Sequence, residues 1–268
     1  MDNNREISIS IIMPVKNSHK YIYKSLDSLL IQKDDFSELI IIDDNADTNH
    51  LKNIERYLNL YMRNKSFKII KNESSIHGPG MARNIGVNHA KSSYIAFLDD
   101  DDIWPNNYLA LRKNFIKKNN SKFSASPYEY IDESFNKNNI VNSKKNILKQ
   151  EDFLFQNPIG NSTVIIDKKL LLKVGGYSKL FKRNDYATWL RVSRLTNCNY
   201  CKNCKNVKIL RRTNSLTSNK FRLIRYQFLA FREANFSIFA SIFLTLSLVI
   251  FVIKRISIKL SNIFKKII

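Results

Sequence analysis

The N-terminal part of the chain alternates between short apolar runs and segments of helical periodicity, and this alternation restricts the fold more than any other feature. The apolar runs are rich in Ile, Leu and Val, which predicts buried strands at 7–15, 38–42, 67–70 and 94–98. Between them, apolar residues recur at three- and four-residue intervals, which predicts helices at 21–31, 51–62 and 81–90. We therefore predict an α/β fold with a mostly parallel sheet between layers of helices.

Three of the predicted strands end in polar or turn-forming residues. The first ends at Pro14 and Asn17, the second at Asp43, Asp44 and Asn45, and the fourth in four consecutive aspartates, Asp99 to Asp102. Ligands of open α/β sheets bind beyond the carboxyl ends of the strands. We expect these residues to line a binding site.

The four aspartates are the most informative of these residues. Adjacent carboxylates repel, and their pKa values rise unless a cation neutralises them. Oxygen ligands suit Mg²⁺ or Mn²⁺, which often bridge one or two carboxylates to substrate phosphates. A solvated acidic turn is the alternative, but this run follows a buried strand directly. We therefore favour a site for a divalent metal ion at this run.

Positive charge is concentrated in the C-terminal third. Of a net charge of +21, residues 1–185 contribute 28 basic against 22 acidic groups, whereas residues 186–268 contribute 16 basic groups and one acidic group. This third contains an uncharged apolar run, 236–253, near the lower length limit for a membrane-spanning helix. Apolar residues beyond it recur at helical spacing between cations, as in helices that lie on anionic lipid. We predict membrane attachment, either spanning or in one leaflet; a buried core helix is the alternative.

Other segments give weaker indications. The N-terminus, Met1 to Glu6, is polar and does not resemble a signal peptide, so we expect the main domain on the cytoplasmic side. Cys198, Cys201 and Cys204 are odd in number and have no neighbouring His, which favours reduced thiols over a disulfide framework or a zinc site. Residues 119–146 are polar and rich in Lys and Asn, and we expect loops and edge structure there.

Six short motifs follow one another in an order that indicates a family. They are Ser8–Asn17, Leu39–Asn45, Gly78–Gly86, Phe97–Trp104, Gly175–Tyr177 and Asn184–Arg191. Together they resemble family 2 glycosyltransferases, which are inverting enzymes with the GT-A fold, a Rossmann-like fold that binds nucleotide-diphosphate sugars. The resemblance implies a catalytic domain at 1–217, with a nucleotide-sugar half at about 1–105 and an acceptor half at about 106–217. Residues 218–268 would then form the membrane-associating tail.

The resemblance also implies roles for individual residues. Asp99 and Asp101 would bind the metal, with Asp100 and Asp102 in supporting roles. Pro14, Asp99 and Asp100 would line the nucleotide-sugar site, and Asp44 would bind uracil or ribose unless it only stabilises a turn. Arg83 would contact the diphosphate unless it is a surface arginine, and Arg211 and Arg212 would close over it. Asp185 would be the general base that deprotonates the acceptor hydroxyl; a helix N-cap is the alternative.

Two departures from the family pattern qualify these roles. Asn184 stands where an acidic residue is commoner, and Thr213 stands where His often follows the arginine. The Gln-x-x-Arg-Trp motif of chain-elongating synthases is absent from the sequence, which favours transfer of one sugar per encounter.

The implied function is transfer from a UDP-sugar to a lipid-linked saccharide in O-antigen or related surface-polysaccharide assembly, at the cytoplasmic face of a bacterial inner membrane. By analogy, the donor would be UDP-glucose or UDP-galactose, and the acceptor N-acetylglucosamine-diphospho-undecaprenol, joined by a β linkage. A polyprenyl-phosphate or lipopolysaccharide-core transferase is the alternative within the class. A non-catalytic nucleotide-sugar-binding protein and a basic nucleic-acid-binding protein are alternatives outside it. The apolar run and the aspartates argue against nucleic acid as a partner.

Overall fold

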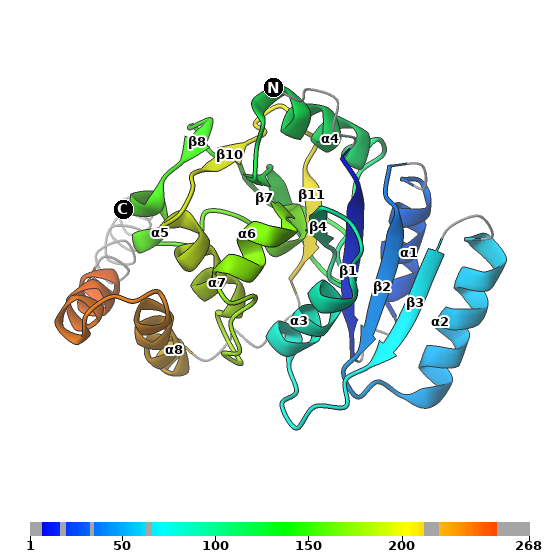
Figure 1. Cartoon of the computed structure of the whole chain (residues 1–268), viewed down its shortest axis with the longest axis horizontal. Coiled ribbons are helices and arrows are strands. Elements are labelled where there is room, and N and C mark those ends of the chain that lie inside the picture. Colours follow the sequence, from blue (N-terminus) through cyan, green and yellow to red (C-terminus); the bar gives the residue numbers. More distant parts are fainter. Residues whose placement is uncertain (1–6, 17–19, 33–34, 63–65, 212–219, 251–268) are drawn as a thin grey trace, which may run out of the picture.

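The structure is a computed structural model that describes residues 7–16, 20–32, 35–62, 66–211 and 220–250 (Figure 1). Its centre is an eight-stranded sheet in the order β3-β2-β1-β4-β9-β5-β10-β8. A three-stranded sheet, β11-β6-β7, lies beside it. The two sheets place the ends of several strands around one region, where the predicted site residues lie.

The N-terminal half confirms the predicted series of strands and helices. Strands β1 (Ile9–Val15), β2 (Glu38–Asp43), β3 (Ser66–Lys71) and β4 (Tyr94–Phe97) are parallel. They are joined through helices α1 (Ile22–Leu30), α2 (Thr48–Tyr61) and α3 (Pro79–His89). Each helical connection returns the chain to the end of the sheet at which the previous strand began. The carboxyl ends of the four parallel strands therefore lie together at the opposite end.

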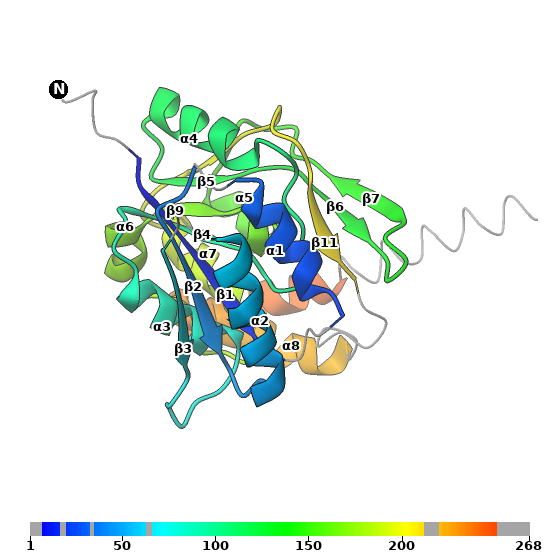
Figure 2. The ribbon, with the colours of Figure 1, turned by 90° about the vertical axis from the view of Figure 1, so that its right-hand side faces the viewer.

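Helices cover both faces of the sheet (Figure 2). Alternate side chains of β1 and β2 enter two separate cores, because successive residues of a strand point to opposite faces. One core contains α1, α2 and α4 (Tyr108–Asn119); the other contains α3, α6 (Lys168–Lys173) and α7 (Asn184–Ser193). This double cover is the reason that the strands are apolar throughout.

The second half extends the sheet with shorter elements. Strands β9 (Ile165–Asp167), β5 (Phe123–Ala125), β10 (Cys198–Tyr200) and β8 (Ile147–Leu148) continue it in mixed orientation. The small sheet consists of β6 (Tyr128–Ile131), β7 (Lys137–Val141) and β11 (Val207–Leu210). The expectation of loops and edge structure at 119–146 was therefore partly wrong, because β5 is buried inside the main sheet. Its three residues are too few to give a periodic signal.

The C-terminal region begins with α8 (Lys220–Glu233), whose inner residues pack on α7. Gln227 Nε2 donates to the Tyr186 hydroxyl over 3.0 Å, and the Phe231 ring lies 6.2 Å from the Tyr186 ring. Residues 238–250 are helical, while 251–268 fall outside the described residues. In the described part of the chain, no helix combines the length and the apolar character needed to cross a membrane. The predicted tail thus includes a helix that is docked on the main domain.

The cysteine prediction is corrected by the structure. Cys201 and Cys204 form a disulfide, whereas Cys198 is buried and free. A turn in which the Cys204 amide donates to the Cys201 carbonyl brings the two Cα atoms to 5.5 Å, within the usual range for a disulfide. Counting cysteines could not reveal this local turn.

Candidate active site

Backbone hydrogen bonds align the strand ends that the sequence singled out. The Asp44 amide donates to the Val15 carbonyl over 2.9 Å, and the Leu98 amide donates to the Ile12 carbonyl over 3.1 Å. Pro14 lies opposite Ile42 in the β1–β2 register, and the Lys16 amide lies 3.5 Å from the Asp100 carboxylate. The predicted polar residues therefore gather at one edge of the sheet.

Asp99 joins three parts of the site. Its Oδ1 accepts a hydrogen bond from Arg83 over 2.5 Å and another from the Asn161 amide over 3.0 Å. Arg83 is buried, and it also donates to Asn184 Oδ1 over 3.1 Å. Burial alone would lower the pKa of Arg83, but the Asp99 carboxylate, Tyr177 and Asp185 together outweigh burial and raise it. Arg83 is not a surface arginine, so that alternative was wrong.

Asp102 is built into the structure more deeply than its neighbours. It is buried, and it accepts hydrogen bonds from the Ser162 hydroxyl over 2.5 Å and from the Leu210 amide over 3.1 Å. Burial, followed by the nearby Asp101 and Asp99 carboxylates, raises its pKa well above the usual aspartate value. Asp102 thus ties the end of β4 to β11, and its raised pKa reflects burial first and the neighbouring carboxylates second.

Asp99 and Asp101 are the carboxylates that could hold a divalent cation. Both are partly exposed, in contrast to Asp102, and both contribute to the charge that shifts the pKa of Asp102. The described residues contain no cluster of three or more His, Cys, Asp or Glu side chains arranged as a metal site. Two carboxylates with open positions fit Mg²⁺ or Mn²⁺ when phosphate oxygens complete the coordination. The donor set therefore fits these ions.

Asp44 is buried within a hydrogen-bond network. Its Oδ1 accepts from Asn72 over 2.7 Å and lies 3.0 Å from His77 Nδ1, and its Oδ2 accepts from the Gly78 amide over 2.8 Å. Gly78 is the N-cap of α3 and has a φ of +131°. Asp44 therefore fixes the turn before α3 to the end of β2, and the same network brings Asn72 and His77 to the site.

Asp185 lies in the first turn of α7, on the opposite side of the site from β1 and β2. The N-cap of α7 is Arg183, so the alternative of an Asp185 N-cap was wrong. Asp185 Oδ2 accepts a hydrogen bond from the Asn157 amide over 2.9 Å. Burial raises the pKa of Asp185, although the Tyr186 backbone amide and Arg83 act in the opposite direction. A half-buried carboxylate of raised pKa is suited to accept a proton.

A pocket of about 240 Å³ brings the two sides of the site together. Asp99, at the end of β4, and Asp185, at the start of α7, both line it, together with Asn157 and Asn161. The two aspartates are 86 positions apart in the sequence. Their convergence places a carboxylate of the predicted metal pair and the predicted base on one cavity.

Comparison with known proteins agrees with this architecture. The family model described as "Glycosyl transferase family 2" matches residues 10–176. The chain belongs to glycosyl transferase family 2. One family relative is the E. coli protein WfgD, a UDP-Glc:alpha-D-GlcNAc-diphosphoundecaprenol beta-1,3-glucosyltransferase; it is 32% identical over 225 residues, which cover 82% of this chain and 83% of WfgD.

Solved structures share the GT-A fold of this family 2 chain. TarS (residues 1–349) from S. aureus, solved with UDP, has a TM-score of 0.69 and 19% identity, over 91% of this chain and 71% of TarS. The mannosyltransferase PcManGT from Pyrobaculum calidifontis, solved with GDP-Man and Mn²⁺, has a TM-score of 0.57 and 14% identity, over 85% of this chain and 63% of PcManGT. At these identities the likeness shows the fold.

Two family motifs, distant in sequence, are locked together in the structure. The Asn84 side chain accepts a hydrogen bond from the Tyr177 amide over 2.7 Å and donates to the Tyr177 carbonyl over 2.9 Å. A Cβ atom on Gly80 would lie 2.1 Å from the Ser178 carbonyl oxygen. Gly80 therefore permits the close contact that holds α3 against the turn before α7.

Arg211 lies apart from the pocket that Asp99 and Asp185 share. It is exposed at the end of β11, and its guanidinium lies 4.2 Å from the centre of the Tyr130 ring. It lines a larger cavity next to that pocket, whereas Arg212 falls outside the described residues. The structure thus places Arg211 beside the reaction pocket, toward the small sheet.

Sequence reasoning missed the residues that support the two aspartates. Asn157 contacts Asp185 and Asn161 contacts Asp99, while the Ser162 hydroxyl bonds Asp102 and accepts from the Asp99 amide over 3.1 Å. Asn161 and Ser162 belong to the 3-10 helix η1 (Asn161–Thr163). No periodicity marks these polar residues, since they lie between short elements; only their contacts identify them.

Proposed function

We propose that the protein is an inverting glycosyltransferase that moves one sugar from a UDP-sugar to a lipid-linked saccharide in surface-polysaccharide assembly. The observation that carries the proposal is the shared pocket of Asp99 and Asp185. One carboxylate serves the nucleotide diphosphate and the other serves the acceptor. Such a division is what a direct displacement between two bound substrates requires.

Asp185 acts as the general base. An acceptor hydroxyl oxygen attacks the anomeric carbon of the donor sugar while its proton passes to the Asp185 carboxylate. The bond from the anomeric carbon to the diphosphate oxygen breaks, and its electron pair leaves with UDP. Attack opposite the leaving group inverts the anomeric configuration, so an α-linked donor gives a β-linked product. Asn157 orients Asp185 through the 2.9 Å hydrogen bond.

The nucleotide side of the site consists of Pro14, Asp44, Arg83, Asp99 and Asp100, whereas Arg211, also expected there, lines the neighbouring larger cavity. Mn²⁺ or Mg²⁺ bound by Asp99 and Asp101 would neutralise the diphosphate charge as UDP leaves. Arg83 holds Asp99 in place over 2.5 Å and keeps a positive charge behind it. The Asp44 network presents Asn72 and His77 beside the nucleoside end.

The choice of substrates rests on the relatives. WfgD, which shares 32% identity over most of both chains, is described as transferring glucose to N-acetylglucosamine-diphospho-undecaprenol. The substrates that we propose are UDP-glucose or UDP-galactose and N-acetylglucosamine-diphospho-undecaprenol, joined by a β linkage. An acceptor of this kind is embedded in a membrane, so the enzyme must work at a lipid surface.

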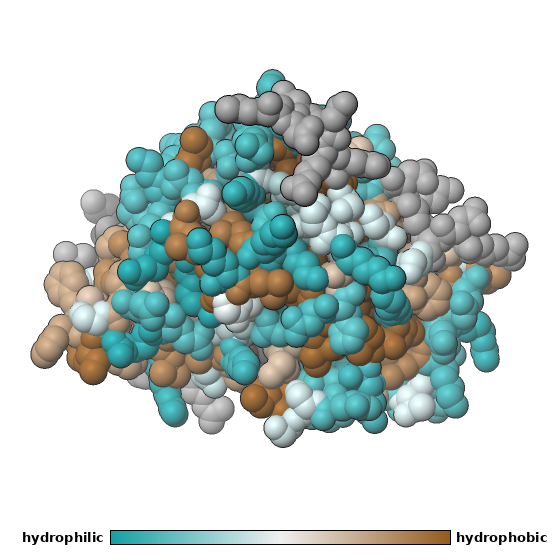
Figure 3. Space-filling view, in the orientation of Figure 1, coloured by the Kyte–Doolittle hydropathy of each residue, from teal (hydrophilic) through white to brown (hydrophobic). Residues whose placement is uncertain are grey.

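Helix residues 238–250 supply that contact with the cytoplasmic face of the bacterial inner membrane. The side chains of Phe239 and Phe243 are 84% and 69% exposed, whereas Ser241 and Thr245 are buried. In a helix that faces water the polar side chains are exposed and the apolar ones are buried, so the arrangement here is reversed. Hydrophobic surface is also visible at this end of the molecule (Figure 3). The cations of 254–266 in the sequence complement anionic headgroups. The tail predicted at 218–268 would therefore attach the protein to the membrane through the exposed apolar face of residues 238–250.

The experiment is a transfer assay with the full chain in detergent and Mn²⁺. Radiolabelled UDP-glucose and UDP-galactose are each offered with synthetic N-acetylglucosaminyl-diphosphate lipid, and the product linkage is read by NMR. We expect one β-linked sugar to be added. Failure to consume any UDP-sugar with any sugar-diphosphate lipid would refute the proposal.

A further inference from the structure

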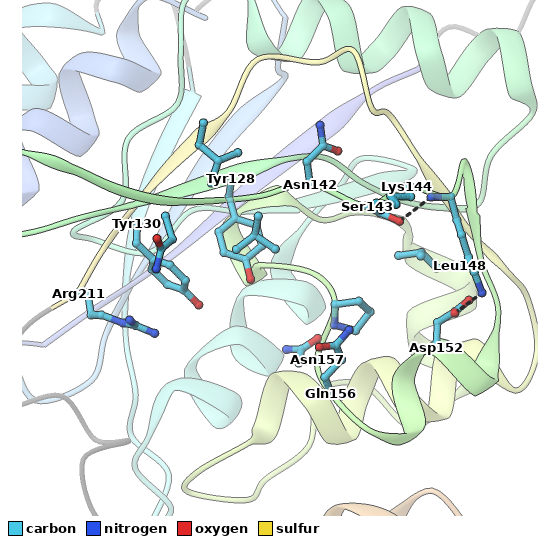
Figure 4. Close-up of a pocket in the computed structure, with 15 residues that line it drawn as sticks. Tyr128, Tyr130, Asn142, Ser143, Lys144, Leu148, Asp152, Gln156, Asn157 and Arg211 are labelled. Carbon is cyan, nitrogen blue, oxygen red and sulfur yellow. Dashed lines mark hydrogen bonds and ion pairs between the residues drawn. The ribbon is translucent and has the colours of Figure 1, made fainter. Parts of the chain in front are cut away.

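A second, larger cavity of about 880 Å³ adjoins the pocket of Asp99 and Asp185 (Figure 4). The two cavities share Tyr128, Tyr130 and Asn157 as lining residues. The larger one lies between the small sheet and the segment around α5 (Gln150–Leu154), outside the nucleotide-sugar half of the fold. A ligand there reaches the base from the side opposite β1 and β2.

Asn157 stands at the junction of the two cavities. Its Nδ2 donates to Asp185, which fixes the orientation of the amide and directs Oδ1 away from the carboxylate. That Oδ1 atom is buried and has no hydrogen-bond donor among the described residues. An unpaired buried carbonyl is costly, and such atoms in functional sites are commonly satisfied by a ligand. A sugar hydroxyl next to the one that reacts would supply the missing donor.

The charges of the larger cavity differ in sign from those of the smaller one. The smaller pocket is lined by three carboxylates, Asp99, Asp102 and Asp185. The larger cavity is lined by Lys144, Lys145 and Arg211, with Asp152 as its one carboxylate. Asp152 lies 2.5 Å from the Lys145 ammonium, so it is already neutralised. In the described part of the structure, neither Lys144 nor Arg211 forms an ion pair with a carboxylate.

The two unpaired cations lie at opposite ends of the larger cavity (Figure 4). Arg211 lies at the end of the cavity that contains Tyr130, with its guanidinium against the Tyr130 ring. Lys144 lies at the end of the cavity that contains Asp152. The end near Tyr130 and Asn157 borders the base and offers aromatic rings and an amide, which suit a sugar. The end near Lys144 is distant from the base and suits an anion attached to that sugar.

We infer that the larger cavity binds the acceptor, with its sugar against Tyr130 and Asn157 and its phosphate toward Lys144. This inference rests on the proposed function and adds the acceptor's location, its polar anchor and its phosphate contact. The Asn157 Oδ1 atom accepts a hydrogen bond from a non-reacting hydroxyl, while Nδ2 keeps Asp185 directed at the reacting one. Lys144 binds the phosphate through its positive charge, whereas Tyr130 and Asn157, where the two cavities join, select the sugar.

The test compares two synthetic acceptors that carry the same sugar and alkyl chain, decyl N-acetylglucosaminyl diphosphate and decyl N-acetylglucosaminide. Asn157→Ala is expected to raise the KM of both acceptors by roughly tenfold, since both lose the same sugar hydrogen bond. Lys144→Ala is expected to raise the KM of the diphosphate acceptor by roughly tenfold and to leave that of the neutral glycoside unchanged. The KM of the UDP-sugar stays constant in both variants.

Lys118→Ala is the matched control, because Lys118 is an exposed lysine on α4 that does not line the cavity. Equal acceptor KM values in Lys144→Ala and Lys118→Ala would overturn the phosphate contact, and unchanged acceptor KM values in Asn157→Ala would overturn the sugar anchor. Either result with normal transfer by the unaltered enzyme leaves the proposed function standing. Absence of transfer by the unaltered enzyme to both acceptors would instead overturn the proposed function, and the inference with it.

Discussion

Arg83 donates a hydrogen bond to Asp99 over 2.5 Å, and its second terminal nitrogen donates to Asn184 over 3.1 Å. One buried guanidinium therefore connects α3, the end of β4 and the start of α7. The centre of the Tyr177 ring lies 5.0 Å from the same guanidinium. Arg83 therefore helps to set the position of Asp99 relative to α7, the helix that carries Asp185.

Replacing Arg83 by Met should destabilise the fold by about 3 kcal/mol, because it leaves a carboxylate in a partly buried site without its counter-ion. Urea unfolding followed by circular dichroism measures the change. Lys118→Met is the matched control, since Lys118 is an exposed lysine on α4 that forms no ion pair with a carboxylate in the described part of the chain. An exposed lysine contributes little to stability, so a loss in Lys118→Met as large as that in Arg83→Met would contradict the structural role of Arg83.

Asp185→Asn should lower kcat by about a thousandfold, because an amide cannot accept the proton of the acceptor hydroxyl. The fold should persist, since Asn157 can still donate to the new side chain. Calorimetric titration with the UDP-sugar should show near-normal affinity. Asp132→Asn, in the turn between β6 and β7, is a control that removes one carboxylate outside the pocket. Substantial turnover in Asp185→Asn would exclude Asp185 as the base.

The pH dependence of kcat/KM should reflect the raised pKa of Asp185. Burial disfavours the carboxylate, so the protonated form persists to a higher pH than in an exposed aspartate. The base works only when deprotonated. As pH falls, kcat/KM should therefore decline with unit slope at a pH above the ordinary aspartate value of 3.8. A decline centred at or below that value would show that the titrating group is not a buried Asp185.

Thermal stability should respond to Asp185 in the corresponding direction. A group whose pKa is raised in the folded state makes folding less favourable as pH rises through that pKa. Asp185→Asn should therefore have a higher Tm than the unaltered protein at neutral pH, and the difference should shrink in acid. A Tm that is lower than normal at neutral pH would show that the carboxylate stabilises the fold.

Chelation should test the proposed metal pair. EDTA is expected to abolish transfer, and Mn²⁺ or Mg²⁺ to restore it, because the diphosphate needs its charge neutralised on departure. Asp101→Asn should raise the Mn²⁺ concentration for half-maximal activity by about tenfold or more, since it removes one of two carboxylate ligands. Full activity in excess EDTA would refute the metal assignment.

Membrane attachment should depend on the exposed face of residues 238–250. Phe239→Asp combined with Phe243→Asp should reduce binding to vesicles with anionic lipid by about a hundredfold, because two phenyl groups that would enter the lipid are lost. Vesicle co-sedimentation measures the change. Phe155→Asp is a matched control, as Phe155 is also an exposed aromatic residue, at 48%, but lies at the end of α5. An equal loss in the control would place the lipid contact elsewhere.

The elements that the sequence predicted well are those with a strong repeating pattern. Strands β1 and β2 are continuous apolar runs because both of their faces are buried, and the structure places them within two residues of the prediction. Strand β5 and helix η1 are only three residues long, which is too short for any period to show. The disulfide of Cys201 and Cys204 likewise depends on a turn that spacing alone does not specify.

The sequence by itself determined the α/β series, the aspartates at the strand ends and the family, because periodicity and short motifs are local properties of a chain. Only the tertiary structure decided that Asp185 and Asp99 face one pocket, that Asn157 holds the former, and that Arg83 is buried against the latter. These relationships join residues far apart in the chain, and chain packing sets their distances. The polar side chains that connect them carry no pattern that could be recognised before the chain is folded.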